Sequence, residues 1–183
     1  QKNYSISEQI AAFVKNLRRE DIPAEVFDAV RMHMIDTIGV ALLSSETAPT
    51  SPMITKVVLE KDSKPECTLW GSDKRVELTD AILCNGTVIH GLDFDDTHTG
   101  AITHPSASIL PVAFALGQKL HKSGEEILTA AVAGYEVIVR LGLAAHGKFH
   151  DHGFHPTGIL APFASVCVAA KLMDVDEKTI VNA

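Results

Sequence analysis

An all-α fold is predicted by this 183-residue sequence, and three observations support it. Apolar residues recur at helical spacing along most of the chain. Two serine–glutamate pairs, Ser5 with Glu8 and Ser123 with Glu126, match the capping box that begins a helix. Only residues 66–78 read as extended, since "CTLWG" and "RVEL" flank the turn-like "SDK", which predicts one short β-hairpin. Neither a repeat nor a linker interrupts the pattern, so we expect one predominantly helical unit.

Three helices are expected before the hairpin. The first follows Ser5, where the apolar residues that would form its buried face begin. Pro23 opens a second, longer helix that ends near Ser45, because proline is favoured in the first helical turn. A third helix begins near Pro52 and ends in the charged loop "EKDSKPE".

Helical periodicity predicts four more helices, at residues 79–89, 106–120, 123–145 and 157–173. The most apolar run, residues 127–145, carries Glu136 and Arg140 four residues apart, which favours a buried helix over a membrane span. The glycines of "HGKFHDHGFH" predict a loop with solvated histidines. The final "DVDEKTIVNA" reads as the start of another helix without its C-cap, so we expect a piece of a longer polypeptide.

Charge and cysteine content narrow the possible partners and compartment. The formal net charge of -7 argues against nucleic acid and against an anionic membrane surface, since either would need a basic face. The three cysteines, Cys67, Cys84 and Cys167, are too widely spaced for a disulfide framework or a local zinc or iron–sulfur motif. Together with the polar start "QKNYSISEQ", which does not resemble a signal peptide, they predict reduced thiols in a cytoplasmic protein.

Titratable groups gather in "HGLDFDDTHTGAITHPSAS", residues 90–108, which holds three aspartates and three histidines. Asp93, Asp95 and Asp96 would repel one another if all were ionised, so cationic or hydrogen-bonding partners are expected nearby. Asp95 and Asp96 are expected to be structural, either capping the loop or pairing with basic groups elsewhere.

Two histidines occupy matching positions in the sequence. "THPSASILPVAFALGQ" and "FHPTGILAPFASVCVAAK" share the order His, Pro, Ser or Thr, and then an apolar helix with a second proline. His104 and His155 are therefore expected at or just before helix N-termini. Such positions attract carboxylates and favour neutral imidazole, which exchanges protons near pH 7. The two helix starts are candidates to share one di- or trianionic organic acid; alternatively, both histidines are caps or hydrogen-bonded structural residues.

Other interpretations fit parts of the aspartate cluster. "DFDDT" matches the motif of haloacid-dehalogenase-like phosphatases, which predicts a buried β-strand directly before Asp93. Protonating terpene cyclases share D-x-D-D but need aromatic walls, and the aromatic content here is 5%. A divalent metal could be held with the aid of His146, His150 or His152, which lack a recognised ligand spacing. A noncatalytic helical interaction module is a further alternative.

In combination, the motifs resemble the N-terminal half of the MmgE/PrpD family. The resemblance covers essentially the whole chain and rests on "DTIGVALLSS", "WGSDKRVELTDAILCNGTVIHGLDFDD", "HGLDFDDTHTGAITHPSASILPVAFALGQ", "GYEVIVRLGLAA" and "GFHPTGILAPFASVCVAAKLM". It implies a lyase or isomerase such as 2-methylcitrate dehydratase, cis-aconitate decarboxylase or iminodisuccinate epimerase. These act on small polycarboxylates without metal, iron–sulfur cluster or organic cofactor. The resemblance also implies that residues 1–183 are the N-terminal part of a helical main domain, that later sequence supplies a lid domain, and that the protein is a homodimer.

Carried over residue by residue, the resemblance places Asp93, Thr97, His104 and His155 in the pocket, and it implies a pocket lysine beyond residue 183. His98 stands where some relatives have an aromatic group, and it is a candidate substrate contact. The expected chemistry is proton abstraction or delivery at a carbon next to a carboxylate. His104 is the expected acid/base, and His155 a second proton-transfer or carboxylate-orienting group. Asp93 would orient a histidine or the lysine, and Thr97 would donate a hydrogen bond to substrate.

Overall fold

In the computed structural model, which describes residues 4–183, local capping signals set where several helices begin. Ser5 Oγ accepts the N–H of Glu8, and the Glu8 carboxylate accepts the N–H of Ser5, at the start of α1 (Ile6–Asn16). The same reciprocal pair, Ser123 and Glu126, begins α6 (Gly124–Ala145). Pro23 directly precedes α2 (Ala24–Thr47). The two predicted capping boxes are therefore confirmed.

The other elements follow the predicted order closely. The remaining helices are α3 (Thr50–Leu59), α4 (Leu78–His90), α5 (Ser106–Lys119), α7 (Lys148–Asp151), α8 (Pro156–Met173) and α9 (Glu177–Asn182), with a 3₁₀ turn at Arg19–Asp21. Strands β1 (Cys67–Thr68) and β2 (Arg75–Val76) pair antiparallel, with Cys67 opposite Val76. Within residues 4–183 this hairpin is the only sheet, so the predicted all-α fold with one hairpin in residues 66–78 is confirmed.

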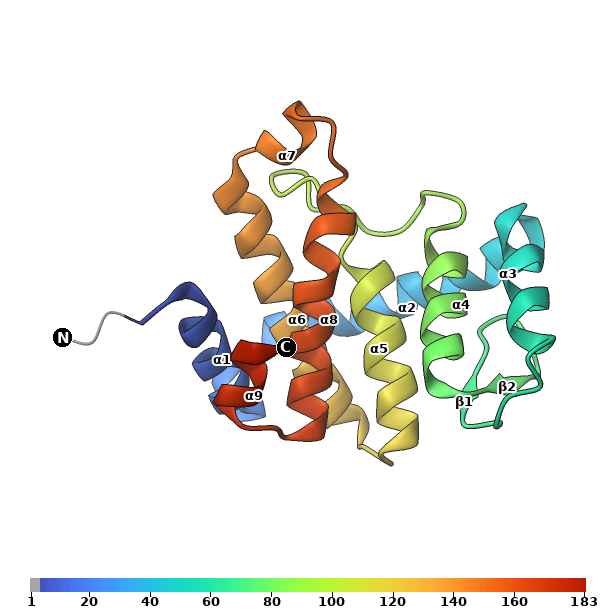
Figure 1. Cartoon of the computed structure of the whole chain (residues 1–183), viewed down its shortest axis with the longest axis horizontal. Helices are drawn as coiled ribbons and strands as arrows, with labels where there is room; N and C mark the ends of the chain where they lie inside the picture. Colours follow the sequence, from blue (N-terminus) through green and yellow to red (C-terminus); the bar gives the residue numbers. More distant parts are fainter. Residues whose placement is uncertain (1–3) are drawn as a thin grey trace.

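The helices that carry the candidate site form the centre of the fold. α5, α6 and α8 stand side by side, α4 lies against α5, and α3 lies beyond α4 (Figure 1). Apolar side chains of α5, α6 and α8 fill the space between them, among them Ile109, Ile138 and Val168, all 0% exposed. Gly134 allows this close packing, because a Cβ there would lie 2.7 Å from Val168 Cγ2. The starts of α5 and α8 are thus held by one core.

α5 and α8 each contain an internal proline six residues after the proline of their His-Pro pair. Pro111 has no N–H to donate to the carbonyl oxygen of Ala107, and Pro162 has none for that of Gly158. The first turns of both helices therefore have one fewer potential backbone hydrogen bond.

The histidine-rich stretch differs in part from its prediction. "HGKFHDHGFH" was expected to be a loop, but Lys148–Asp151 form the single-turn helix α7. His146 and Gly147 adopt left-handed backbones, with φ of 48° and 76°, which ends α6 and reverses the chain before α7. So short a helix has too few apolar positions to show a period. His146, His150 and His152 are exposed, as predicted.

Two helices, α6 and α8, are long and apolar enough to cross a membrane by length and composition alone. In the fold 56% of the most apolar window of α6 and 44% of that of α8 are buried. Both helices pack against α5 in the hydrophobic core, which agrees with the buried helix predicted for residues 127–145.

Candidate active site

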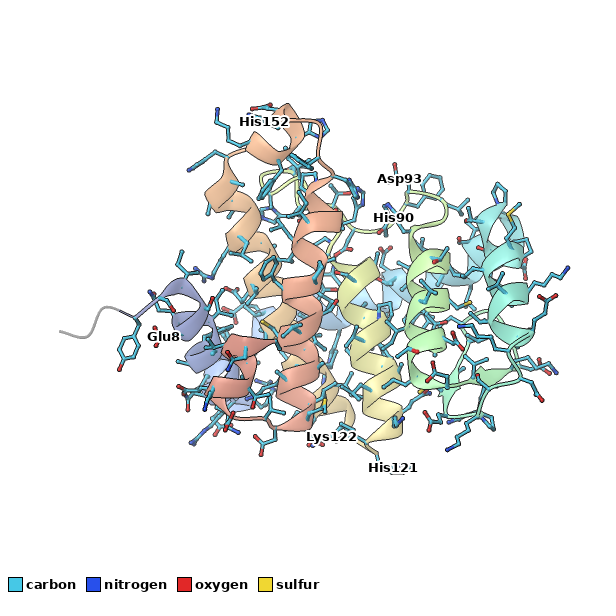
Figure 2. The ribbon with its side chains drawn as sticks, viewed as in Figure 1. Glu8, His90, Asp93, His121, Lys122 and His152 are labelled. Carbon is cyan, nitrogen blue, oxygen red and sulfur yellow. The ribbon has the colours of Figure 1, made fainter. Side chains whose placement is uncertain are left out.

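The loop between α4 and α5 carries most of the candidate groups. α4 ends at His90 and α5 begins at Ser106. Asp93 has a left-handed backbone, with φ of 57°, a conformation that aspartate tolerates better than most residues. Figure 2 shows His90 and Asp93 together at this end of α4. The titratable cluster of the sequence thus folds as a helix end, a turn and a helix start.

Asp95 is the buried centre of this cluster, with a side chain that is 0% exposed. Its Oδ1 lies 3.0 Å from Nδ1 of His90 and 3.5 Å from Nδ1 of His104. A carboxylate without a hydrogen only accepts hydrogen bonds, so the tautomer of His90 that suits this contact has its hydrogen on Nδ1 and its Nε2 turned away from Asp95. One buried carboxylate therefore orients the ring of His90 and faces that of His104.

His104 is held by contacts from three segments. Thr97 Oγ1 lies 3.3 Å from its Nδ1, and Asp93 Oδ1 lies 3.7 Å from its Nε2. The backbone N–H of His104 donates to Thr157 Oγ1 of α8 at 2.9 Å. The side chain is 19% exposed. The structure therefore brings together Asp93, Thr97 and His104, three of the predicted site residues.

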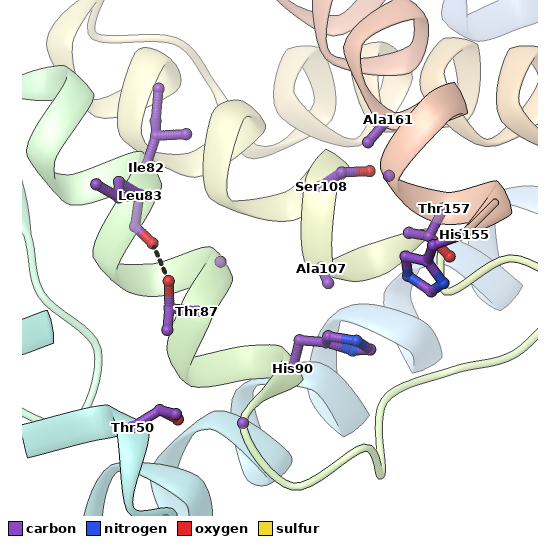
Figure 3. A pocket seen from close by; sticks show the side chains of 13 residues that line it. Thr50, Ile82, Leu83, Thr87, His90, Ala107, Ser108, His155, Thr157 and Ala161 are labelled. Carbon is purple, nitrogen blue, oxygen red and sulfur yellow. Dashed lines mark hydrogen bonds between the residues drawn. The ribbon is translucent and has the colours of Figure 1, made fainter. Parts of the chain in front are cut away.

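His155 approaches the same cluster from α8. It directly precedes Pro156, the first residue of that helix, as the sequence predicts. The ring centroid of His90 lies 6.2 Å from that of His155 and 5.0 Å from that of His104. In Figure 3 the His90 and His155 side chains extend toward each other across a pocket. The two predicted histidines thus both lie beside His90, which places the two helix starts in one region; that they share an anion stays a prediction.

A cavity of about 680 Å³ opens beside these rings. Its walls come from the C-terminal half of α4, the first turn of α5 and the start of α8 (Figure 3). They combine two imidazoles and several hydroxyl groups with small and apolar residues: His90, His155, Thr50, Thr87, Ser108, Thr157, Ile82, Leu83, Ala107, Ala161 and three glycines. Such a volume admits a small organic acid. Of the predicted site residues, His155 lines the cavity, and Asp93, Thr97, His98 and His104 do not. The ring of His104 lies 5.0 Å from that of His90, which does line it.

The two helix starts differ in how their first N–H groups are used. At α5 the Ser106 N–H donates to Oδ1 of Asp96 at 3.0 Å. At α8, among residues 4–183, no side chain caps the helix, and Pro156 at its first position has no N–H. The N–H groups of Thr157 and Gly158 follow in the first turn, and both residues line the cavity. The start of α8 is therefore the better candidate for binding an anion.

Asp96 links the loop to two further helices. Its Oδ2 lies 3.1 Å from Nδ1 of His33 on α2, and its side chain is 10% exposed. Burial raises the pKa of the Asp96 carboxyl, and the hydrogen bond from Ser106 and the nearby His33 oppose that rise. Ser106 Oγ in turn bonds the hydroxyl of Tyr135, whose pKa is also raised by burial. The prediction that Asp96 caps the loop and pairs with a basic group is confirmed.

His98 lies in the turn between Thr97 and His104. Its Nδ1 accepts the N–H of Ala101 at 3.1 Å, and its backbone N–H donates to the Thr103 carbonyl at 2.9 Å. These contacts give His98 a role in shaping the turn. A contact of His98 with substrate stays a prediction.

Three residues of the cluster were not among the site residues predicted from the sequence. His90 brings the other two histidines together, Asp95 faces two of the rings, and Thr157 ties His104 to α8. His90 could have been noticed as a histidine at the end of the helix predicted for residues 79–89. For Asp95 and Thr157 the signal lies in packing, which sequence spacing alone does not report.

The phosphatase interpretation of "DFDDT" is wrong. That motif requires a buried β-strand directly before its first aspartate, and here α4 ends at His90, three residues before Asp93. Apolar residues of α4 recur at helical spacing, and Val88 and Ile89 are buried against the hairpin and α5. A helix, and not the β-strand that the phosphatase motif requires, therefore precedes the aspartates.

Comparison with known proteins agrees with this geometry. The sequence profile of the MmgE/PrpD N-terminal domain matches residues 8–183. The chain is 32% identical over 177 residues to the cis-aconitate decarboxylase of Homo sapiens, covering 92% of this chain and 36% of that protein. It is 30% identical over 175 residues to the Mus musculus enzyme, with the same coverage, and 23% identical over 184 residues to that of Aspergillus terreus, covering 97% of this chain and 37% of the relative. The chain thus spans little more than a third of the length of these relatives. With its helical fold and its paired His-Pro helix starts, the chain belongs to the MmgE/PrpD family, and residues 8–183 match the N-terminal domain of that family.

Proposed function

We propose that this domain forms part of the active site of a lyase or isomerase that acts on a small di- or tricarboxylate without a cofactor. The shared step is proton transfer at a carbon next to a carboxylate. The observation that carries the proposal is the convergence of His90, His104 and His155, with buried Asp95 behind two of the rings and a cavity in front. Imidazoles whose orientation is fixed by a carboxylate are suited to take up and release a proton near neutral pH.

The uncapped start of α8 supports an anionic substrate. The N–H groups in its first turn and the positive end of the helix dipole would bind one carboxylate. His155, immediately before that turn, would orient the same carboxylate or supply a second proton-transfer group. The formal net charge of this chain is -7, so an anion bound to it is expected to be held by such a local arrangement.

His104 is the proposed acid/base. Thr97 lies beside its Nδ1 and Asp93 near its Nε2, so the ring is oriented before substrate arrives. Exposed Asp93 would tune the proton affinity of His104, and the Thr97 hydroxyl would donate to a substrate oxygen. In a decarboxylation, the bond to the departing carboxyl group breaks, CO₂ leaves, and the electron pair remains on the substrate. A proton from His104 then completes the product, and solvent restores the proton to the ring.

cis-Aconitate is the first substrate to test, because the three relatives described above are cis-aconitate decarboxylases. The full-length polypeptide would be incubated in D₂O with cis-aconitate, with citrate-like tricarboxylates or with iminodisuccinate, and followed by proton NMR. We expect deuterium at the carbon next to a carboxylate in one of these acids or in its product.

The same acids should also raise the melting temperature of the full-length protein. A noncatalytic helical interaction module would show neither deuterium incorporation nor thermal stabilisation by any of them. That joint result would overturn the proposed function.

A further inference from the structure

A compact set of four donor groups lies at the centre of the candidate site. His90, Asp93, Asp95 and His104 each bring one nitrogen or oxygen atom to within 4.8 Å of those of the other three. Oδ1 of Asp95 lies 3.0 Å from Nδ1 of His90 and 3.5 Å from Nδ1 of His104, whereas Oδ1 of Asp93 lies 3.7 Å from the other ring nitrogen of His104, Nε2. One nitrogen of each ring would bind the ion. Ligand atoms bound tetrahedrally at about 2.0–2.2 Å from Zn²⁺ lie about 3.3–3.6 Å from one another. Small side-chain movements, with the hydrogen of His90 moved from Nδ1 to Nε2, would bring this set to ligating distance.

The donor types select one class of ion. Two imidazole nitrogens and two carboxylate oxygens suit Zn²⁺, Co²⁺ and similar divalent transition metals. Mg²⁺ and Ca²⁺ prefer oxygen ligands alone, and thiolate-dependent sites would need cysteine. Cys67, Cys84 and Cys167 are buried elsewhere in the helical core.

The charges around the cluster favour a cation there. The Asp95 side chain is 0% exposed, and Asp93 and Asp96 lie within two residues of it in the chain. Within residues 4–183, the ion pairs formed by these three carboxylates are all with histidines: His33, His90 and His104. A buried carboxylate without a cation beside it is costly. A single dication between Asp93 and Asp95 would supply the missing charge.

The framework combines rigid and adaptable ligands. His90 is fixed at the end of α4, and the backbone N–H of His104 is tied to Thr157. Asp93, in contrast, has a side chain that is 77% exposed and lies on a turn. It can close onto an ion without disturbing the helices.

We infer that His90, Asp93, Asp95 and His104 bind one divalent transition-metal ion of the Zn²⁺ class, and that this ion and the substrate exclude each other. Metal binding follows from the donor geometry alone. The exclusion rests on the proposed function, because a metal would occupy the nitrogen lone pairs and the carboxylate that orient and perform proton transfer. The ion would therefore act as a reversible inhibitor of the enzyme.

Cobalt titration of the metal-free, full-length protein tests the site directly. Co²⁺ absorbs visible light strongly in tetrahedral coordination, and Zn²⁺ added later should abolish that absorption. We expect saturation at one ion per chain, and at least about a tenfold loss of Co²⁺ affinity in His90→Ala and in Asp93→Asn. Because Asp93 is exposed, its variant should fold even if the His90 variant does not.

Two matched controls separate this site from scattered surface histidines and aspartates. His152→Ala removes an exposed histidine at the end of α7, and Asp62→Asn changes an exposed aspartate that also has a left-handed backbone, with φ of 46°. Both should bind Co²⁺ as the unmodified protein does. Failure to saturate at one ion, or equal losses in control and site variants, would overturn the metal site.

Competition between the metal and cis-aconitate tests the second part. Zn²⁺ should raise the apparent KM linearly with its free concentration and leave kcat unchanged, and a chelator should restore activity. Cobalt binding with an unchanged KM would overturn the exclusion while leaving the metal site in place. If cis-aconitate is not turned over, the cobalt titration still decides the metal site, and the failure then belongs to the proposed function.

Discussion

The starts of α5 and α8 share a His-Pro sequence and an internal proline at the same spacing, yet they lie in different surroundings. His104, before α5, has a side chain that is 19% exposed and contacts Asp93, Asp95 and Thr97. His155, before α8, is exposed, and the centroid of its ring lies 6.2 Å from that of His90. The same local sequence has thus produced one histidine already held in place and one that remains open to a ligand.

The difference indicates a division of roles. The first N–H group of α5 is already bonded to Asp96. We therefore expect the start of α5 to position His104 and not to bind an anion. The start of α8 has no side-chain cap within the described part of the chain, so its N–H groups are available to an anion. Proton transfer is therefore expected to depend on the α5 side and substrate affinity on the α8 side.

The largest effect is expected from His104→Ala. Loss of the proposed acid/base should lower kcat by about 10²- to 10⁴-fold, because no other group would be positioned to donate or accept the proton. Deuterium entry from solvent, measured by proton NMR on the full-length protein, should fall in parallel. His152→Ala, in an exposed histidine remote from the cluster, should leave both rates unchanged. A folded His104→Ala protein with normal exchange would reject the assignment.

Asp95→Asn should have the next largest effect, a fall of about 10²-fold in kcat with a smaller change in KM. The introduced amide can donate to Nδ1 of His90, which favours the wrong tautomer of the ring and misdirects its Nε2. Kinetics combined with nitrogen NMR of the histidine rings would detect both changes. Asp73→Asn, in an exposed residue of the hairpin turn, is the matched control. A normal tautomer with lowered kcat would show that Asp95 acts in some other way.

His155→Ala should act mainly on affinity. We expect KM to rise about tenfold, since one charge-assisted hydrogen bond to a substrate carboxylate is lost while His104 keeps its contacts. His155→Gln, which retains a hydrogen-bond donor, should recover part of the affinity. A fall in kcat as large as that of His104→Ala would remove the distinction between the two helix starts.

The smallest effect is expected at the start of α6, which is capped by its own side chains. Hydrogen bonding from the Ser123 backbone, with help from Lys122 and the Ser123 hydroxyl, lowers the pKa of Glu126 to about 2. A carboxyl with a lowered pKa stabilises the fold above its unfolded pKa, and that contribution disappears as the pH falls from about 4.5 toward 2. Glu126→Gln should lower the melting temperature by about 1–2 °C at neutral pH and have no effect near pH 2.

Glu125→Gln provides the comparison for that measurement, because it lies in the same first turn but outside the capping box. It should show a smaller change with pH than Glu126→Gln. Equal pH profiles for the two variants would mean that the capping box does not account for the stabilisation.

Much of the fold could be predicted from sequence because its signals are local. Ser5 with Glu8 and Ser123 with Glu126 begin their helices through contacts three residues apart. The hairpin follows from its turn residues, and the long helices follow from their apolar spacing. α7 could not be predicted, since a single turn between glycines leaves too short a pattern.

The candidate site could be predicted only in part, because only some of its residues have a signal in the neighbouring sequence. His104 and His155 were identified because proline marks the helix starts beside them, and Asp93 and Thr97 because they belong to a motif. The pairing of Asp96 with His33 joins residues 63 positions apart in the numbering, and the bond from His104 to Thr157 joins residues 53 apart. Such contacts depend on how helices pack, which no short sequence window contains.

Pro111 and Pro162 have a consequence for motion. Neither proline has an N–H, so the carbonyl groups of Ala107 and Gly158 lack the helical hydrogen bond that another residue would donate there. Both Ala107 and Gly158 line the cavity. Unwinding the first turn of either helix therefore breaks fewer bonds than unwinding a turn of α6. Local opening near the two His-Pro pairs can thus occur while the rest of the bundle stays intact, and backbone amides there should exchange with solvent sooner than those of α6.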